Sequence, residues 1–249
     1  MNLSDFFQEN PKTALAFSGG VDSAYLLYAA KAYGADATAY SVKTAFQPQF
    51  EYEDACRLAD ELGMPMKTIE LDVLADAEVT LNPNNRCYYC KRKIFTAILS
   101  AAKDDGYTVV MDGTNASDDV NDRPGMKALT ELSVRSPLRE CGLTKDVIRK
   151  LSQEAGLFTW DKPAYACLAT RIPTGTEITA DLLSQTESAE NDLRNLGFSN
   201  FRIRLMGTAA RLQLPESQLP SLIARRSEVF DTLRRYYPAV LLDLEVRDE

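Results

Sequence analysis

The stretch Ala14-Leu-Ala-Phe-Ser-Gly-Gly-Val-Asp-Ser-Ala24 decides how the chain folds. A short apolar run ends at two glycines, and the residues that follow read as the first turns of a helix. Glycine allows a tight turn and a close approach of the backbone to a ligand, and a helix start directs N–H groups at an anion. Ser18 and Ser23 would add hydroxyl donors, and Asp22 could hold a cation that bridges phosphates. The stretch therefore predicts a phosphate site, with an ordinary capped strand-to-helix corner as the structural alternative.

The bulk composition indicates a globular protein. The chain has 249 residues, 45% of them hydrophobic and 26% charged, which suits one large domain or a medium one with an appendage. No apolar run is long enough to span a bilayer. Residues 1–10 lack the basic segment and apolar core of a signal peptide. We therefore expect a cytoplasmic protein with no membrane partner.

Charge and residue usage exclude several kinds of chemistry. The net charge is −8, and an acidic chain is a poor starting point for neutralising nucleic-acid phosphates, so a nucleic-acid partner is not expected. The chain has no histidine, which removes Ser-His-Asp and Cys-His catalysis. Five cysteines are an odd number in an apparently cytosolic chain, which argues against a disulfide framework.

Apolar and helical patterns alternate through the first two thirds of the chain. Predicted strands cover 13–17, 37–42, 66–71 and 108–111, and predicted helices cover 23–33, 50–62 and 87–102. This rhythm predicts the α/β class, with a parallel sheet covered by helices. Ligands bind at the carboxyl ends of such strands, so we expect the loops 18–23 and 112–115 to face each other.

The pattern changes after a loop at 160–175. Before it, we expect a short strand over 133–138 and a helix over 144–155 that Thr144 caps. After it, the expected elements are helices over 178–196 and 215–235 and strands over 201–205, 211–214 and 239–244. The sequence thus predicts one domain over 1–172 and a smaller α+β domain over 176–249.

Two cysteines, Cys87 and Cys90, stand at CxxC spacing near a helix start. This spacing alone fits a redox pair, half of a zinc site or part of an iron–sulfur site. No second CxxC and no histidine are present to complete a zinc site. Cys167 lies far away in the sequence, and Cys56 and Cys141 are expected to be structural.

Together these motifs resemble the LarE-type sulfur transferases, a branch of the PP-loop ATP pyrophosphatase superfamily with an adenine nucleotide alpha hydrolase-like fold. The resemblance covers nearly the whole chain, and its motifs occur in order. The matching stretches are 18–23, 85–91, 112–115 with Asp118 and Asp119, 123–125, 136–138, 143–145, 162–171, 201–204 and 207–212.

The resemblance implies a two-step reaction that uses ATP and Mg²⁺. A carboxylate of pyridinium-3,5-biscarboxylate mononucleotide is adenylylated with release of pyrophosphate, and sulfur then displaces AMP to give a thiocarboxylate for the nickel-pincer nucleotide cofactor. Asp22 would be catalytic in the first step. The implied ATP-binding residues are Ser18, Gly19, Gly20, Val21, Asp22, Ser23, Gly113 and Asn115.

The family supplies sulfur in two ways. In one variant Cys87, Cys90 and Cys167 hold a 4Fe-4S cluster, and in the other Cys167 gives up its own sulfur and becomes dehydroalanine. Three thiolates leave one iron of the cluster without a protein ligand, so hydrosulfide can bind there repeatedly. A free surface thiol is mostly protonated at neutral pH and is a weak donor. We therefore favour the cluster, which makes the three cysteines catalytic.

The resemblance also implies a substrate site and partners. Lys91, Arg202 and Arg204 would hold the substrate phosphate, since the planar fork of arginine suits phosphate. The partners would be a small-molecule nucleotide, sulfide or another sulfur donor, and further copies of this chain, as a hexamer formed through the small domain. The implied substrate-binding residues are Lys91, Thr170, Arg171, Glu190, Arg202 and Arg204.

Some positions depart from the family pattern. Leu205 and Met206 stand where a histidine is usual, Gln213 replaces a frequent acid, and the stretch 243–247 lacks a common extension. These changes put the exact substrate in doubt and leave the ATP chemistry untouched. The alternatives are a cluster-dependent tRNA thiolase and a non-catalytic nucleotide-binding regulator.

Overall fold

The structure, a computed structural model, describes residues 2–119 and 124–247. Arg123, in one of the matching stretches, lies outside the described residues. The chain forms two compact units, Met1–Val73 with Asn85–Lys162 and Leu74–Asn84 with Pro163–Glu249. These units differ from the predicted ranges in the segments 74–84 and 163–172, and the functional domain boundary stays a prediction. No helix in the described part of the chain has the length and apolar character needed to cross a membrane.

The first unit is built on a parallel four-stranded sheet, which confirms the predicted α/β class. The strand order is β3-β2-β1-β4, so β1 has β2 on one side and β4 on the other. The order of the strands along the sheet therefore changes direction between β1 and β4. At such a point the loops that follow the two strands run to opposite sides, and a ligand can bind between them. The strands are β1 (Lys12–Ala16), β2 (Asp36–Lys43), β3 (Met66–Glu70) and β4 (Val109–Met111).

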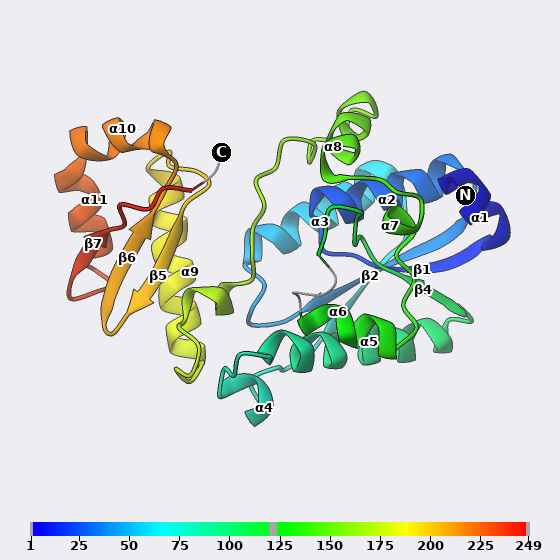
Figure 1. The fold of residues 1–249 in the computed structure, drawn as a ribbon, viewed down its shortest axis with the longest axis horizontal. Coiled ribbons are helices and arrows are strands. Elements are labelled where there is room, and N and C mark those ends of the chain that lie inside the picture. Colours follow the sequence, from blue (N-terminus) through cyan, green and yellow to red (C-terminus); the bar gives the residue numbers. More distant parts are fainter. Residues whose placement is uncertain (1, 120–123, 248–249) are drawn as a thin grey trace. The chain divides into compact units, whose positions relative to one another are not determined.

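Helices cover both faces of this sheet (Figure 1). Two helices pack against one face, and they are α5 (Arg86–Asp104) and α6 (Pro124–Glu131). The helices on the other face are α1 (Leu3–Glu9), α2 (Val21–Ala32), α3 (Gln49–Leu62), α7 (Pro137–Glu140) and α8 (Lys145–Glu154).

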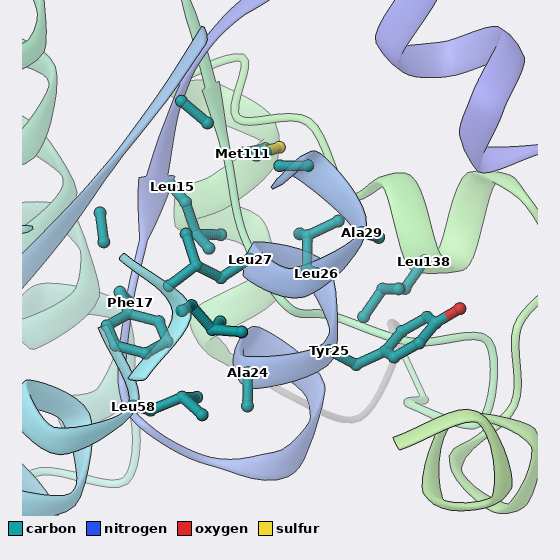
Figure 2. Close-up of a cluster of buried hydrophobic side chains, with 14 of the residues drawn as sticks. Leu15, Phe17, Ala24, Tyr25, Leu26, Leu27, Ala29, Leu58, Met111 and Leu138 are labelled. Carbon is teal, nitrogen blue, oxygen red and sulfur yellow. The ribbon is translucent and has the colours of Figure 1, made fainter. Parts of the chain in front are cut away.

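The helix α2 is the centre of the larger core (Figure 2). Its residues Leu26 and Leu27 have no exposed surface, and Leu15 of β1 and Leu138 of α7 are equally buried. A helix that is apolar nearly all round is stable only where other elements surround it. This packing fixes the start of α2, and with it the loop that precedes the helix.

The structure corrects one prediction in the first unit. The predicted strand over 133–138 is wrong, because Arg135 makes only an isolated bridge to Met111 and Pro137 begins the short helix α7. Proline has a helix-compatible φ and lacks the N–H that a helix start leaves unpaired. The helix predicted over 144–155 is present as α8, and Thr144 occupies its N-cap position but makes no side-chain cap hydrogen bond among the described residues.

The second unit has a small mixed sheet of order β5-β6-β7. β5 and β6 are antiparallel, and β6 and β7 are parallel. Ile203 and Leu212 of the sheet pack with Leu193 and Leu233 of the helices in one buried cluster. The strands are β5 (Arg202–Met206), β6 (Ala209–Gln213) and β7 (Val240–Leu242). The helices are α4 (Ala77–Thr80), α9 (Ala180–Asn195), α10 (Leu219–Ala224) and α11 (Arg226–Leu233), with 3₁₀ turns η1 (Leu168–Arg171) and η2 (Glu216–Gln218).

Two details of this unit differ from the sequence prediction. The single helix predicted over 215–235 is wrong, because the chain forms η2, α10 and α11, and Arg225 leaves helical geometry between the last two. The segment 74–84 was not expected to join this unit. It does so through Asn82, whose carbonyl accepts from Gly175 N at 2.9 Å and whose side-chain amide donates to the Pro173 carbonyl at 2.9 Å.

Candidate functional site

The loop between β1 and α2 has the geometry of a phosphate-binding turn. Gly19 has a φ of +74°, and a Cβ there would lie 2.9 Å from the Cβ of Ala55 in α3. A side chain at this position is therefore excluded both by backbone conformation and by space. Gly20 is the N-cap of α2 and offers no side-chain cap to the first turn. Such a helix start presents its N–H groups to an anion.

The two serines of the loop hold it in shape. The Oγ atoms of Ser18 and Ser23 are 3.1 Å apart, and Ser23 Oγ also donates to the carbonyl of Gly20 at 3.1 Å. The N–H of Gly20 donates to Ser18 Oγ at 3.4 Å. The hydroxyls thus brace the turn from within, in the place where the sequence predicts phosphate donors.

The loop after β4 contacts this turn, as predicted for the carboxyl ends of neighbouring strands. A Cβ at Gly113 would lie 2.8 Å from Ser23 N, so only glycine allows this approach. Asn115 Nδ2 donates to Asp22 Oδ1 at 3.4 Å. Gly113 and Asn115, both predicted from the resemblance, therefore lie beside Asp22.

The remaining polar groups of the second loop stabilise the loop itself. Asp112 is buried, and its carboxylate accepts from Thr114 Oγ1 at 2.5 Å and from Ser136 Oγ at 2.7 Å. Asp118 Oδ2 accepts from the backbone N–H of Asn115 at 3.0 Å. The N–H of Ser117 donates to Asn115 Oδ1 at 2.8 Å, and this bond leaves the amide nitrogen of Asn115 directed toward Asp22.

Two lysines reach the turn from distant parts of the chain, and sequence reasoning assigned neither of them a role. Lys145, the first residue of α8, donates through Nζ to Asp22 Oδ2 at 2.6 Å, with side-chain exposures of 30% and 22%. Both lysines fall in stretches that carried the family resemblance, 143–145 and 162–171, which was the available signal. Spacing could not show that they end at the same loop.

The second of these lysines is more enclosed. Lys162 Nζ lies 2.6 Å from Asp54 Oδ2, 3.1 Å from Glu51 Oε1 and 3.5 Å from the carbonyl oxygen of Gly19. Arg149 fixes the backbone here by donating to the carbonyl of Lys162 at 2.8 Å. A lysine flanked by two carboxylates thus links α3 to the glycine turn.

The two cysteines of the CxxC stretch begin α5. Cys87 is exposed and Cys90 is half-buried, and residues three apart lie on the same helix face. Arg86 Nη2 lies 3.6 Å from Cys87 Sγ, which places a positive charge beside a thiol. Lys91 extends across α6, since a Cβ at Gly125 would lie 2.7 Å from Lys91 Cδ.

In the second unit, Arg171 and Glu190 form a sealed ion pair. Their side chains are 0% and 1% exposed, with Nε to Oε1 at 2.8 Å and Nη2 to Oε2 at 3.1 Å. Burial opposes the charge of Arg171, but the bonds to Glu190 outweigh it and raise the pKa of the guanidinium. Tyr165 also donates to Glu190 Oε2, and burial together with that carboxylate raises the pKa of the phenol above its ordinary range.

Cys167 lies beside this pair as the N-cap of η1. Its carbonyl accepts from Thr170 N at 3.0 Å, from Thr170 Oγ1 at 2.8 Å and from Arg171 Nη1 at 3.3 Å. Arg171 Nη1 also donates to the carbonyl of Ala166 at 2.7 Å. The backbone on both sides of Cys167 is therefore fixed by Thr170 and Arg171.

Arg202 and Arg204 share one face of β5 because alternate strand residues point the same way. Arg202 is buried and donates to the carbonyls of Ala164 at 2.6 Å and Phe201 at 2.9 Å. Burial, and next the charge of Arg171, lower the pKa of Arg202 to about 10. Arg204 stands opposite Arg211 across the sheet, and its buried Nε has no hydrogen-bond partner in the part of the chain that the structure describes. Of the two, Arg204 therefore retains a donor for an anion.

The cysteines predicted to share a cluster are divided between the units. Cys87 and Cys90 belong to the first unit and Cys167 to the second. Among the described residues, no group of three or more cysteine, aspartate or glutamate side chains is arranged to hold a metal ion. The meeting of the three thiols thus stays a prediction.

Comparison with known proteins identifies the family. No protein-family model matches the chain. It is 38% identical to an uncharacterized protein of Synechocystis sp., over 98% of this chain and 92% of the relative. It is 34% identical to the pyridinium-3,5-bisthiocarboxylic acid mononucleotide synthase of Lactiplantibacillus plantarum, over 94% of this chain and 86% of that synthase.

More distant relatives match a smaller share of the chain. A tRNA-specific 2-thiouridylase of Clostridium botulinum is 29% identical over 60% of this chain and 51% of its own length. The match to the synthase, by contrast, runs through both units. The chain is therefore an enzyme that belongs to the LarE-type ATP-dependent sulfur transferases of the PP-loop superfamily.

Proposed function

We propose that the protein uses ATP to activate a carboxylate of pyridinium-3,5-biscarboxylate mononucleotide and converts it into a thiocarboxylate. The observation that supports this most strongly is the meeting of two glycine-containing loops at Asp22, in a chain that matches the synthase of Lactiplantibacillus plantarum over 94% of its length. The product would serve the biosynthesis of the nickel-pincer nucleotide.

The first step is adenylylation. A carboxylate oxygen of the substrate attacks the α-phosphorus of ATP, the bond to the β-phosphate oxygen breaks, and pyrophosphate leaves. The backbone of Ser18–Val21 would hold the phosphates, the hydroxyl of Ser23 would keep the turn in shape, and Gly113 and Asn115 would close the opposite side. The carboxylate of Asp22 suits Mg²⁺, which prefers oxygen ligands and substrate phosphates, and Mg²⁺ would neutralise charge on the departing pyrophosphate.

The second step is sulfur transfer. A sulfur nucleophile attacks the carbonyl carbon of the acyl-adenylate, the carbon–oxygen bond to AMP breaks, and a thiocarboxylate remains. Cys87, Cys90 and Cys167 would hold the 4Fe-4S cluster, and the exposure of Cys87 and the shared face of the CxxC pair fit thiolate ligation. Such a cluster, when bound, supplies an iron without a protein ligand that can carry hydrosulfide. The alternative source is the sulfur of Cys167 itself.

The substrate phosphate would be held by basic side chains. Arg204 has the clearest capacity, because its buried Nε has no partner among the described residues. Lys91 lies near the CxxC pair, and Thr170 adjoins Cys167. Arg202 donates to backbone carbonyls and would shape this face of the sheet.

The two units would divide the work. The first would bind ATP, and the second would bind the substrate and assemble copies of the chain into a hexamer. The edge strand β7 supports assembly, because its residues Leu241 and Leu242 are 43% and 38% exposed. Paired edges and covered apolar side chains are what assembly would provide there. The place of action would be the cytoplasm.

The test incubates the purified protein with ATP, Mg²⁺ and the biscarboxylate nucleotide, and measures AMP, pyrophosphate and thiocarboxylate. Unmodified tRNA replaces the nucleotide in a second arm. AMP release that depends on the nucleotide supports the proposal. Release with tRNA alone would assign the protein to tRNA thiolation instead.

The sulfur source is tested on protein purified without air. Iron content and visible absorbance report the cluster, and Cys87→Ala should keep pyrophosphate release while stopping repeated turnover of sulfide. Cys56→Ala is the matched control, since that cysteine lies in α3. Loss of sulfur from Cys167 by mass spectrometry, in a protein without iron, would replace the cluster with sacrificial transfer.

A further inference from the structure

The Glu190 carboxylate of the ion pair with Arg171 has no acceptor capacity left for a substrate. Glu190 Oε1 accepts from Arg171 Nε at 2.8 Å and from the backbone N–H of Ile203 at 3.2 Å. Glu190 Oε2 accepts from Arg171 Nη2 at 3.1 Å and from Tyr165 Oη. A carboxylate has about four acceptor sites, and all four are occupied here. Both side chains are also fully enclosed.

Such a pair is an unusual way to fill a protein interior. Removing two charges from water costs more than apolar residues of the same volume would cost, so a buried ion pair is weak evidence for stability as its purpose. Its advantage is geometric, because a bidentate arginine–carboxylate pair fixes both partners in one orientation. The question is therefore what this geometry holds.

The hydrogen bonds of the pair end on two segments that bear reactive groups. Through Arg171 Nη1, the pair reaches the carbonyls of Ala166 and Cys167. Through Glu190 Oε1, it reaches the N–H of Ile203, which lies between Arg202 and Arg204 on β5. Glu190 itself belongs to α9, whose neighbouring residue Ala189 is in the core of the unit.

A second link closes the same connection. Arg202 Nη2 donates to the carbonyl of Ala164 at 2.6 Å, and the guanidinium lies 5.2 Å from the centre of the Tyr165 ring. The Arg171 guanidinium lies 4.4 Å from the centre of the same ring. The segment that leads into Cys167 is thus tied to β5 both through Glu190 and through Arg202.

We propose that Tyr165, Arg171 and Glu190, called here the Glu190 cluster, are positioning residues that hold Cys167 at a fixed place relative to the arginine face of β5. This inference rests on the proposed function and revises the expected role of Arg171 and Glu190 as substrate-binding residues. The cluster takes part in no bond that forms or breaks. It sets where the sulfur of Cys167 stands relative to a phosphate bound at Arg204.

The consequence is a separation of the two half-reactions. Adenylylation uses the loops around Asp22 in the first unit and needs the second unit only to bind the substrate, whereas sulfur transfer also needs Cys167, which the Glu190 cluster holds in the second unit. A displacement of about 1 Å at a reacting atom can cost about 100-fold in rate. Damage to the Glu190 cluster should therefore slow sulfur transfer and leave pyrophosphate release intact when the nucleotide substrate is saturating.

The experiment uses the full-length protein with Arg171→Lys and Tyr165→Phe. Lysine keeps the charge but cannot bond bidentately to Glu190 and reach two carbonyls, and phenylalanine removes one hydrogen bond and keeps the ring. We expect Arg171→Lys to lower thiocarboxylate formation by at least about tenfold, Tyr165→Phe to lower it less, and both to retain pyrophosphate release within about twofold. Equal losses in both half-reactions would overturn the proposal.

A control separates positioning from general destabilisation. Leu193→Ala truncates a fully buried leucine of the same helix without touching the cluster. Each variant is assayed at the same interval below its own melting temperature. Under this condition, Leu193→Ala should keep the ratio of thiocarboxylate to pyrophosphate that the parent protein gives. If Leu193→Ala lowers the ratio of thiocarboxylate to pyrophosphate as much as Arg171→Lys does, the Glu190 cluster has only a structural role.

A chemical readout is independent of the substrate. Iodoacetamide labelling of Cys167, followed by peptide mass mapping, should change in rate by at least about threefold in Arg171→Lys and stay near the parent rate in Leu193→Ala. An unchanged labelling rate in Arg171→Lys overturns the positioning role. If the parent protein forms no thiocarboxylate at all, the proposed function fails. The labelling rates then still test whether the Glu190 cluster positions Cys167.

Discussion

Lys145 pairs with Asp22 in the first unit, Arg171 pairs with Glu190 in the second, and these two ion pairs differ in their exposure to water. Lys145 and Asp22 are 30% and 22% exposed, whereas Arg171 and Glu190 are 0% and 1% exposed. The carboxylate of the first pair also accepts a longer hydrogen bond, of 3.4 Å, from the amide of Asn115. The second has its carboxylate fully occupied by protein donors.

This difference separates an exchangeable ion pair from a permanent one. A half-exposed pair is worth little in stability, so Lys145 can leave Asp22 for a phosphate and Asp22 can take a cation. An enclosed pair cannot lose a partner without leaving a buried charge. The first arrangement suits binding and release of ATP, and the second suits permanent positioning.

The largest expected effect is the loss of stability when the enclosed pair of Arg171 and Glu190 is broken. Arg171→Met leaves the Glu190 carboxylate buried without its cation, so we expect the free energy of unfolding to fall by about 3–5 kcal/mol. Urea denaturation measures it. The double variant Arg171→Met, Glu190→Met removes both charges and should recover most of that loss. A single variant within 1 kcal/mol of the parent, on the order of a surface pair, would show that the pair is not sealed in solution.

Breaking the exchangeable pair of Lys145 and Asp22 should lower the activity of the protein rather than its stability. Asp22→Asn removes the charge that would hold Mg²⁺, so pyrophosphate release should fall by at least about 100-fold. The free energy of unfolding should change by less than about 1 kcal/mol, because the pair is partly solvated. A radioactive pyrophosphate assay and urea denaturation check the two parts. A stable protein with parent activity would remove Asp22 from the mechanism.

Lys145 gives a smaller effect of the same kind. Lys145→Met removes one cation beside the triphosphate, and we expect pyrophosphate release to fall by about tenfold. Lys150→Met is the matched control, since this lysine lies on the same helix with its side chain 77% exposed. Steady-state kinetics with varied ATP should show the loss for Lys145→Met alone. Equal behaviour of the two variants would mean that Lys145 does not meet the nucleotide.

Much of the first unit follows from local patterns in the sequence. Buried strands such as 13–17, the glycine turn and the helix stop at Gly63 each have a short-range physical cause, and the structure places them within a few residues of expectation. The contact between Gly113 and Ser23 also follows from a general property of parallel sheets.

Side-chain partners over long distances could not be predicted. Nothing in the spacing of Lys145, Lys162 or Arg171 shows which carboxylate each meets, because that depends on the strand order and on helix packing. The resemblance marked Arg171 and Glu190 as functional without indicating that they pair with each other. The break at Arg225 likewise has no glycine or proline beside it that would mark a helix end.

The 2.9 Å approach of a Cβ at Gly19 to Ala55 constrains a helix that takes no part in chemistry. Residue 55 faces the turn with no spare volume, so a valine or leucine there would push against the backbone of Gly19 and reshape the anion cradle from behind. The size of the residue at position 55 is thus limited by the shape of the turn that would bind ATP, although this residue need not contact ATP itself. Position 55 of α3 is therefore restricted to the smallest residues, whereas the exposed side of the helix is not constrained in this way.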